Sequence, residues 1–131
     1  MIPLCLKEGI GVIPWSPLAR GLLAGERKSL DDRTATKRAE TDDFSPELYD
    51  QPSDWEVVEA VRRVASAREV PSAEVALAWL LAKPAVVAPI VGVTKLEHLD
   101  AAVRATELSL SEAEMKALEQ PYRPHGVRGR L

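Results

Sequence analysis

The sequence predicts an α/β protein in which parallel strands are connected by helices. Two short runs, Ile10–Ile13 and Ala85–Val91, are continuously apolar and rich in β-branched residues. Such runs are typical of parallel strands that are covered on both faces. The order along the chain is strand, long loop, two helices, strand, helix and helix, which supplies the helical crossovers that parallel strands require. Two such strands cannot close a sheet, so we expect a partial domain over residues 1–131.

The first strand is flanked by helix signals. Apolar residues in Ile2–Leu6 are typical of the last turns of a helix that ends at Gly9. Further along, Ser53 and Glu56 have the capping-box spacing that begins a helix, and Pro71 ends it. Its polar face carries three arginines, Arg62, Arg63 and Arg68.

Three more helices are predicted after Pro71. Ser72 can cap the next one, which is apolar on every side over Val75–Ala82 and should bury Trp79. Thr94 and Glu97 have capping-box spacing before a helix from about residue 96 to 105. That helix should present Leu99, Val103 and Ala102 inward. Ser111 and Glu114 begin the last helix, which ends before Pro121.

The segment 26–53 is expected to be a charged loop, because thirteen of its twenty-eight residues are charged and it has little periodicity. Charges elsewhere are interspersed, and the net charge of −3 disfavours a nucleic-acid or membrane partner. The single cysteine fits a reducing compartment. No apolar stretch reaches the ~18 residues that span a bilayer, and no signal-peptide pattern is present. We therefore expect a cytoplasmic protein.

A candidate binding site follows each predicted strand, where ligands of α/β proteins usually lie. After the first strand, Trp15 offers a flat apolar face, Ser16 a hydroxyl, Arg20 a positive charge and Gly21 room for close approach. This turn could receive a nucleotide with a phosphate. On spacing alone, a buried tryptophan beside an ordinary turn is equally well supported.

The second strand is followed by Gly92 and a helix N-terminus, which suits an anion. Lys95 and His98 lie in or beside its first turn and could reach a phosphate. Alone, a solvated lysine and an incidental histidine are the better interpretation. If the two strands are neighbours, the two turns form a two-point nucleotide clamp.

The sequence contains no recognisable motif for other kinds of functional site. His98 and His125 are far apart and Cys5 is alone, so we expect no metal site. Nucleophile elbows, Walker loops and Rossmann glycine fingerprints are absent. Neither Tyr49 nor Tyr122 is placed at a strand end as a proton donor, so we assign no catalytic residue.

Several stretches resemble the C-terminal part of aldo-keto reductases. They are Ile-Pro-Trp-Ser-Pro-Leu-Ala-Arg-Gly-Leu-Leu-Ala-Gly from Ile13, Val-Ala-Leu-Ala-Trp-Leu-Leu-Ala from Val75, Pro-Ile-Val-Gly-Val-Thr-Lys-Leu-Glu-His-Leu from Pro89, and Leu-Ser-Leu-Ser-Glu-Ala-Glu from Leu108. The likeness extends from about residue 1 to 125, and its subgroup shares Trp-Ser-Pro-Leu with bacterial reductases and potassium-channel β-subunits. It implies the C-terminal portion of a (β/α)8 TIM barrel, with 10–14 as the seventh strand and 86–91 as the eighth.

The resemblance also implies an NADP(H) cradle. Trp15 would stack on the nicotinamide ring, while Ser16, Pro17, Leu18 and Gly21 would line the pyrophosphate, with Ala19 and Arg20 in the same turn. Gly92, Thr94, Lys95 and His98 would hold the adenosine end, and Lys95 favours a 2′-phosphate.

Some positions depart from the family pattern. Glu26 stands where relatives often have lysine, and Ala101 and Ala102 replace a Glu-Asn pair that grips the adenine. The family's catalytic Asp, Tyr, Lys and His belong to earlier strands. We therefore expect a truncated barrel that binds the cofactor weakly or not at all and does not reduce carbonyls alone.

The alternative function is a non-enzymatic half-barrel that assembles with itself or with a partner chain through exposed strand edges. A truncated chain without a stable fold is a third possibility. A different TIM barrel that grips a phosphate with its last two loops is the second choice of ligand class. A carbonyl substrate is expected only where the barrel is complete.

Overall fold

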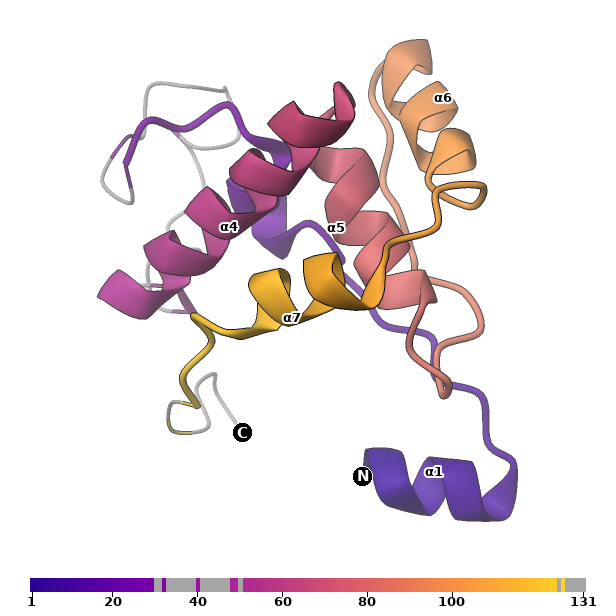
Figure 1. Cartoon of the computed structure of the whole chain (residues 1–131). Coiled ribbons are helices and arrows are strands. Elements are labelled where there is room, and N and C mark those ends of the chain that lie inside the picture. The colour runs from indigo at the N-terminus through magenta and orange to yellow at the C-terminus, as the bar shows by residue number, and fades with distance from the viewer. Residues whose placement is uncertain (30–31, 33–39, 41–47, 50, 125, 127–131) are drawn as a thin grey trace.

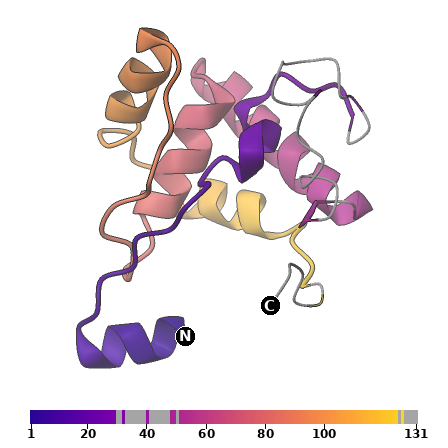
Figure 2. The same ribbon diagram turned by 180° about the vertical axis from the view of Figure 1, so that it is seen from behind.

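The computed structural model describes residues 1–29, 32, 40, 48–49, 51–124 and 126. Its elements in chain order are α1 (Ile2–Glu8), the 3₁₀ helix η1 (Ala19–Ala24), α4 (Pro52–Arg68), α5 (Ser72–Leu81), α6 (Leu96–Arg104) and α7 (Glu112–Glu119). Helices α4, α5 and α7 pack together, with η1 behind α4 and α6 beside α5 (Figure 1). Helix α1 lies apart from this group, at the end of an extended segment, in the front and back views (Figure 2).

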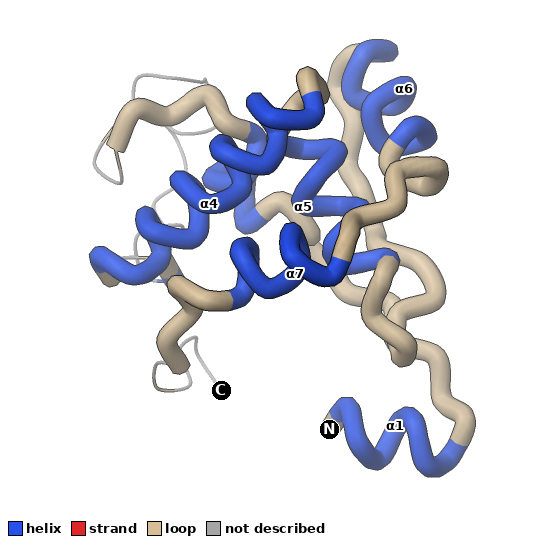
Figure 3. The backbone as a smooth tube through the Cα atoms, viewed as in Figure 1, coloured by secondary structure: helices blue, strands red, loops and turns tan. Residues whose placement is uncertain are grey.

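The two predicted strands do not form continuous strands within the described residues, where the backbone is helix or loop (Figure 3). Two isolated parallel bridges remain, Val12 with Val86 and Trp15 with Ile90. Pro14 and Pro89 lack the N–H that a continuous ladder needs. The predicted burial on both faces is also wrong here, since Ile13 and Val87 are 59% and 61% exposed.

The core lies where α4, α5 and α7 meet. Its buried members are Val61, Val64, Ala65, Val75 and Leu118. The spacing of the three α4 residues places them on one face of that helix, as the sequence pattern predicts. Helix α5 is buried over residues 74–78, whereas Trp79 is only partly buried at the edge of the core. The indole N–H of Trp79 donates a 3.0 Å hydrogen bond to Glu119 on α7.

The helix ends agree with the sequence at some positions and differ at others. Gly9 ends α1 in the left-handed conformation, at φ 66°, as expected for a C-cap glycine. The capping box of α4 lies two residues earlier than predicted, at Gln51 and Asp54 instead of Ser53 and Glu56, with Pro52 in the first turn and the Gln51 N–H bonded to the Asp54 carboxylate. Ser72 does not cap α5, because Pro71 occupies the cap position.

Helix α6 differs most from its prediction. Lys95 rather than Thr94 is its N-cap, and no side chain caps it. The inward face is also wrong: Leu99 and Val103 are exposed, whereas Ala101 and Ala105 are buried and Ala102 is half-buried. Small residues therefore face α5, and the larger apolar side chains point away from the packed helices.

The start of α7 matches its prediction closely. The Ser111 hydroxyl accepts from the Glu114 N–H at 3.3 Å, and the Ser111 N–H donates to the Glu114 carboxylate at 2.7 Å. Arg68 at the end of α4 adds bonds of 2.6 and 2.7 Å to the same carboxylate. These bonds tie α7 to α4 and complete the capping box.

The bonds to Glu114 predict a pH dependence of stability. Hydrogen bonds from Arg68, and then from Ser111, hold the pKa of the Glu114 carboxyl well below its usual range. Lys83 and Trp79 lower the pKa of Glu119 in the same way. Because an unfolded glutamate has a pKa of about 4.3, this stabilisation is present above that pH and is lost as the pH falls toward the folded value.

We therefore expect Glu114→Gln to lower the free energy of unfolding most at neutral pH, with a difference that shrinks below about pH 4. Urea unfolding at about pH 7, 5 and 3 measures this difference. Glu107→Gln, at an exposed position, is the matched control and should change little at any pH. A destabilisation by Glu114→Gln that does not vary with pH would contradict the assignment.

Candidate functional site

The segments that precede the two predicted binding turns pair with each other in parallel. The Val12 N–H donates to Ala85 O at 2.7 Å, and the Val12 carbonyl accepts from Val87 N at 3.0 Å. Closer to the turns, the Ile90 N–H donates to Pro14 O at 2.9 Å. Both segments therefore enter their turns in the same direction, with Trp15 beside Ile90.

Gly11 permits this close pairing. A Cβ at Gly11 would lie 2.8 Å from a methyl group of Val87, which is closer than side chains approach one another. Its role is thus steric, since its φ is not in the left-handed region. A glycine is therefore needed at position 11 because the segment that contains Val87 approaches so closely.

The backbone of the first turn is unusual. Ser16, Ala19 and Arg20 have φ of 49°, 48° and 55°, and Gly21 follows at 94°. Left-handed conformations cost non-glycine residues roughly 1–2 kcal/mol each. The Ser16 hydroxyl offsets part of this cost by accepting the Arg20 N–H at 3.2 Å. Such strain gathers at functional sites, so it supports a binding role for this turn.

Further bonds within the turn fix its shape. The Leu18 carbonyl accepts from Gly21 N at 2.9 Å and from Leu23 N at 3.2 Å, and Ser16 O accepts from Ala19 N at 3.0 Å. Pro17 and Leu18 are half-buried, and Leu22 of η1 is buried. Hydrogen bonds therefore hold the turn in one conformation, and the buried side chain of Leu22 anchors it.

Trp15 is 65% exposed in the structure. The alternative interpretation, a buried tryptophan at a strand end, therefore does not hold for this structure. An exposed indole at the mouth of a fixed turn can stack on a planar ring.

The second turn is open to solvent. Gly92, Thr94, Lys95 and His98 are all exposed, and a Cβ at Gly92 would meet nothing within 4 Å. The Lys95 ammonium lies 3.3 Å from the Glu97 carboxylate. The Lys95 carbonyl accepts the His98 N–H at 3.2 Å, which places His98 in the first turn of α6.

The two turns offer an exposed aromatic ring, a strained turn whose Ala19, Arg20 and Gly21 N–H groups are bonded within the turn, and a lysine at a helix N-terminus. These groups suit a planar ring joined to phosphates. Two carboxylates oppose an anion here, the exposed Glu26 after η1 and Glu97 beside Lys95. Most of the charged segment 26–53 lies outside the described residues, as does His125, so their predicted roles stay predictions.

One positioning group was missed by the sequence pattern. Arg62 was predicted on the solvent face of its helix, but its guanidinium donates to the carbonyls of Gly25 and Arg27 just after η1. No spacing rule could find this contact, because 37 positions separate Arg62 from Gly25. The sequence of α4 indicates only that Arg62 lies on the polar face of the helix.

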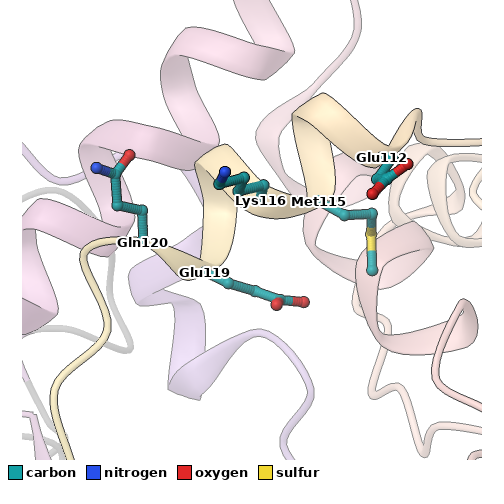
Figure 4. A pocket seen from close by; sticks show the side chains of 5 residues that line it. All are labelled: Glu112, Met115, Lys116, Glu119 and Gln120. Carbon is teal, nitrogen blue, oxygen red and sulfur yellow. The ribbon is translucent and has the colours of Figure 1, made fainter.

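A hollow elsewhere on the surface is unrelated to these turns. Its lining is Glu112, Met115, Lys116, Glu119 and Gln120, all from α7 and its C-cap (Figure 4). Within the described ranges, no group of three or more His, Cys, Asp or Glu could hold a metal ion. In the same part of the chain, no helix has both the length and the apolar character needed to cross a bilayer.

Comparison with known proteins finds one family. The model of the aldo/keto reductase family matches residues 1–123. A Schizosaccharomyces pombe protein provisionally named an aryl-alcohol dehydrogenase is 42% identical over 131 residues, which are all of this chain and 36% of that protein. The versiconal hemiacetal acetate reductase of Aspergillus parasiticus is 35% identical over 97% of this chain and 36% of its own length. The chain thus spans about a third of these relatives.

Proposed function

This chain belongs to the aldo-keto reductase family, and we propose that it is the C-terminal, NADP(H)-binding part of such an enzyme. The family implies a TIM barrel, in which residues 10–14 and 86–91 would be the seventh and eighth strands. The observation that carries the proposal is the parallel pairing at Trp15 and Ile90, the residues from which the chain enters the two candidate turns. The single cysteine, Cys5, is a buried free thiol, which fits the cytoplasm as the proposed location.

The residues of the first turn fit the nicotinamide and pyrophosphate. Trp15 would stack on the nicotinamide ring, and its exposed ring leaves room for that contact. The turn from Ser16 through Pro17, Leu18, Ala19 and Arg20 to Gly21 would line the pyrophosphate. Its fixed backbone and the open space at Gly21 suit close approach by phosphate oxygens. A bound cofactor would supply the hydride for a carbonyl group.

The residues of the second turn are proposed to contact the adenosine end of the cofactor, but more weakly than the first turn contacts the nicotinamide and pyrophosphate. Gly92, Thr94, Lys95 and His98 would contact it, with Lys95 placed for a 2′-phosphate. Glu97 competes for the Lys95 ammonium at 3.3 Å, and both side chains are exposed. We therefore propose weak binding by the isolated chain and a preference for NADPH over NADH.

This preference gives the first test. Lys95→Ala should weaken NADPH binding about 5–10-fold, because it removes a charged contact to the 2′-phosphate, and should leave NADH binding unchanged. Glu97→Gln should strengthen NADPH binding, since it releases Lys95 and removes a repulsive charge. Titration followed by quenching of tryptophan fluorescence measures both affinities.

Lys116→Ala is the matched control, because Lys116 is an exposed lysine on α7 and away from both turns. Equal affinity for NADPH, FMN and a sugar phosphate would favour a different phosphate-binding barrel. No loss of NADPH binding in Lys95→Ala would reject the assignment of Lys95.

We also propose that the chain alone does not catalyse carbonyl reduction. The reaction needs a proton donor beside the nicotinamide. Tyr122 follows α7 rather than either turn, and the first turn, where the nicotinamide would lie, has no carboxyl, imidazole or phenol group. Lys95 and His98 belong to the second turn, at the proposed adenosine end. We expect no NADPH consumption by the purified 131-residue chain with a panel of aldehydes and ketones. Absorbance at the NADPH wavelength measures it, and clear turnover would overturn this statement.

A second candidate function is supported by the exposed apolar surface of the paired segments. Ile10, Ile13, Val87 and Ile90 are each more than half exposed, although they are the residues of the predicted strands. Unpaired strand edges with apolar side chains favour further pairing. The chain would then be a half-barrel that assembles with a second copy or with a partner chain.

Sedimentation velocity tests this alternative. Concentration-dependent association is expected, and Ile13→Lys should shift the chain toward monomer because a charge would be buried in the new interface. Tyr122→Lys, at a similarly exposed apolar position after α7, is the control. A cooperatively folded monomer at all concentrations would count against assembly.

A further inference from the structure

Arg62 on α4 has a set of partners that a solvent-facing arginine would lack. Its Nη2 donates to the Gly25 carbonyl at 3.2 Å and also to the Arg27 carbonyl. Its Nη1 bonds the Glu59 carboxylate at 2.8 Å, and its guanidinium lies 4.8 Å from the centre of the Trp55 ring. The side chain is only 28% exposed. All these contacts hold the planar group in one orientation.

The backbone that Arg62 binds has little freedom to adapt. Gly25 has φ of 90°, and a Cβ there would lie 2.8 Å from the Ser72 hydroxyl at the start of α5. Arg27 is 7% exposed. The segment that leaves η1 therefore lies against Ser72 at the start of α5 and is bonded to Arg62 of α4.

This segment is continuous with the first binding turn. Helix η1 has only six residues, and three of them, Ala19, Arg20 and Gly21, have a positive φ. The Leu18 carbonyl accepts both the Gly21 and the Leu23 N–H, so one acceptor links the first and second halves of η1. A shift at Gly25, which directly follows η1, would therefore disturb the residues proposed to line a pyrophosphate.

We propose that Arg62 is a positioning residue for the binding turn at residues 16–21, which it holds through the carbonyls of Gly25 and Arg27. The inference rests on the proposed nucleotide-binding function. Arg62 does not touch the cofactor in this scheme. It acts by keeping a strained turn in the conformation that receives the phosphates, so less binding energy is lost to ordering the turn.

Arginine suits this role better than lysine. A guanidinium presents several N–H donors in one plane, stacks on an aromatic ring and stays charged. It can therefore bond two carbonyls and a carboxylate at once while lying over Trp55. A lysine has a point charge and could replace one of these bonds but not the set.

Three variants of the full chain test the proposal: Arg62→Ala, Arg62→Lys and the control Arg63→Ala. Arg63 is the exposed neighbour of Arg62 on the same helix. Two measurements are made on each, the affinity for NADPH and the hydrogen exchange of the Gly21 and Leu23 amides. The Met115 amide of α7, bonded to Ser111 O at 2.9 Å, reports on global stability.

We expect Arg62→Ala to weaken NADPH binding about 5-fold or more and to speed exchange at Gly21 and Leu23 relative to Met115. Arg62→Lys should recover only part of both losses, and Arg63→Ala should change neither. Equal acceleration at all three amides would show a purely structural role and overturn the proposal. If Arg62→Ala unfolds the chain, Arg62→Lys decides by the same two measurements.

The two readouts also separate the proposals. Absence of NADPH binding in the unaltered chain would reject the proposed function, while selective exchange at Gly21 and Leu23 would still support the positioning by Arg62. Normal NADPH binding by Arg62→Ala, with unchanged exchange, would reject the positioning role alone.

Discussion

The parallel backbone pairing between 12–15 and 85–90 is the interaction on which the candidate site depends. Three hydrogen bonds join these segments, and each bond connects residues more than seventy positions apart. Without them, the turn at Trp15 and the turn at Gly92 would have no fixed relation. The pairing also explains Gly11, where any side chain would meet Val87. The absence of a side chain at Gly11 thus permits the pairing of the two segments that lead into the candidate turns.

The helical part of the molecule serves as a support for that pairing. Helices α4, α5 and α7 share a core of mostly small and medium aliphatic side chains, and η1 packs against α4 and α5. Polar bonds then hold the outer edges, from Arg68 to Glu114 and from Trp79 to Glu119. The buried Glu74, at 3% exposure, pairs with Arg104 of α6, which satisfies its charge. The turns are therefore fixed by packing on one side and open on the other.

Several large apolar side chains of the kind usually found in a core are exposed here: Ile13, Val87, Leu99 and Val103. For Ile13 and Val87 the reason is pairing, because a parallel strand needs a neighbour on each edge and cover on each face, whereas their two segments pair only with each other in the described residues. A protein of the aldo-keto reductase family meets that requirement with a barrel of eight strands. The exposure of Ile13 and Val87 is thus a consequence of how few strand-forming segments lie in the described chain.

The sequence by itself determined some of the local features, and tertiary structure decided the distant contacts. The Ser111–Glu114 capping box and the helix end at Gly9 were predictable, because their groups lie within four positions of each other. The motifs around Trp15 and Gly92 were sufficient to indicate the family. The exposure of Leu99, the open Trp15 ring and the bonds of Arg62 to Gly25 and Arg27 were not predictable. Each depends on which segments pack together across the fold, and no local spacing encodes that choice.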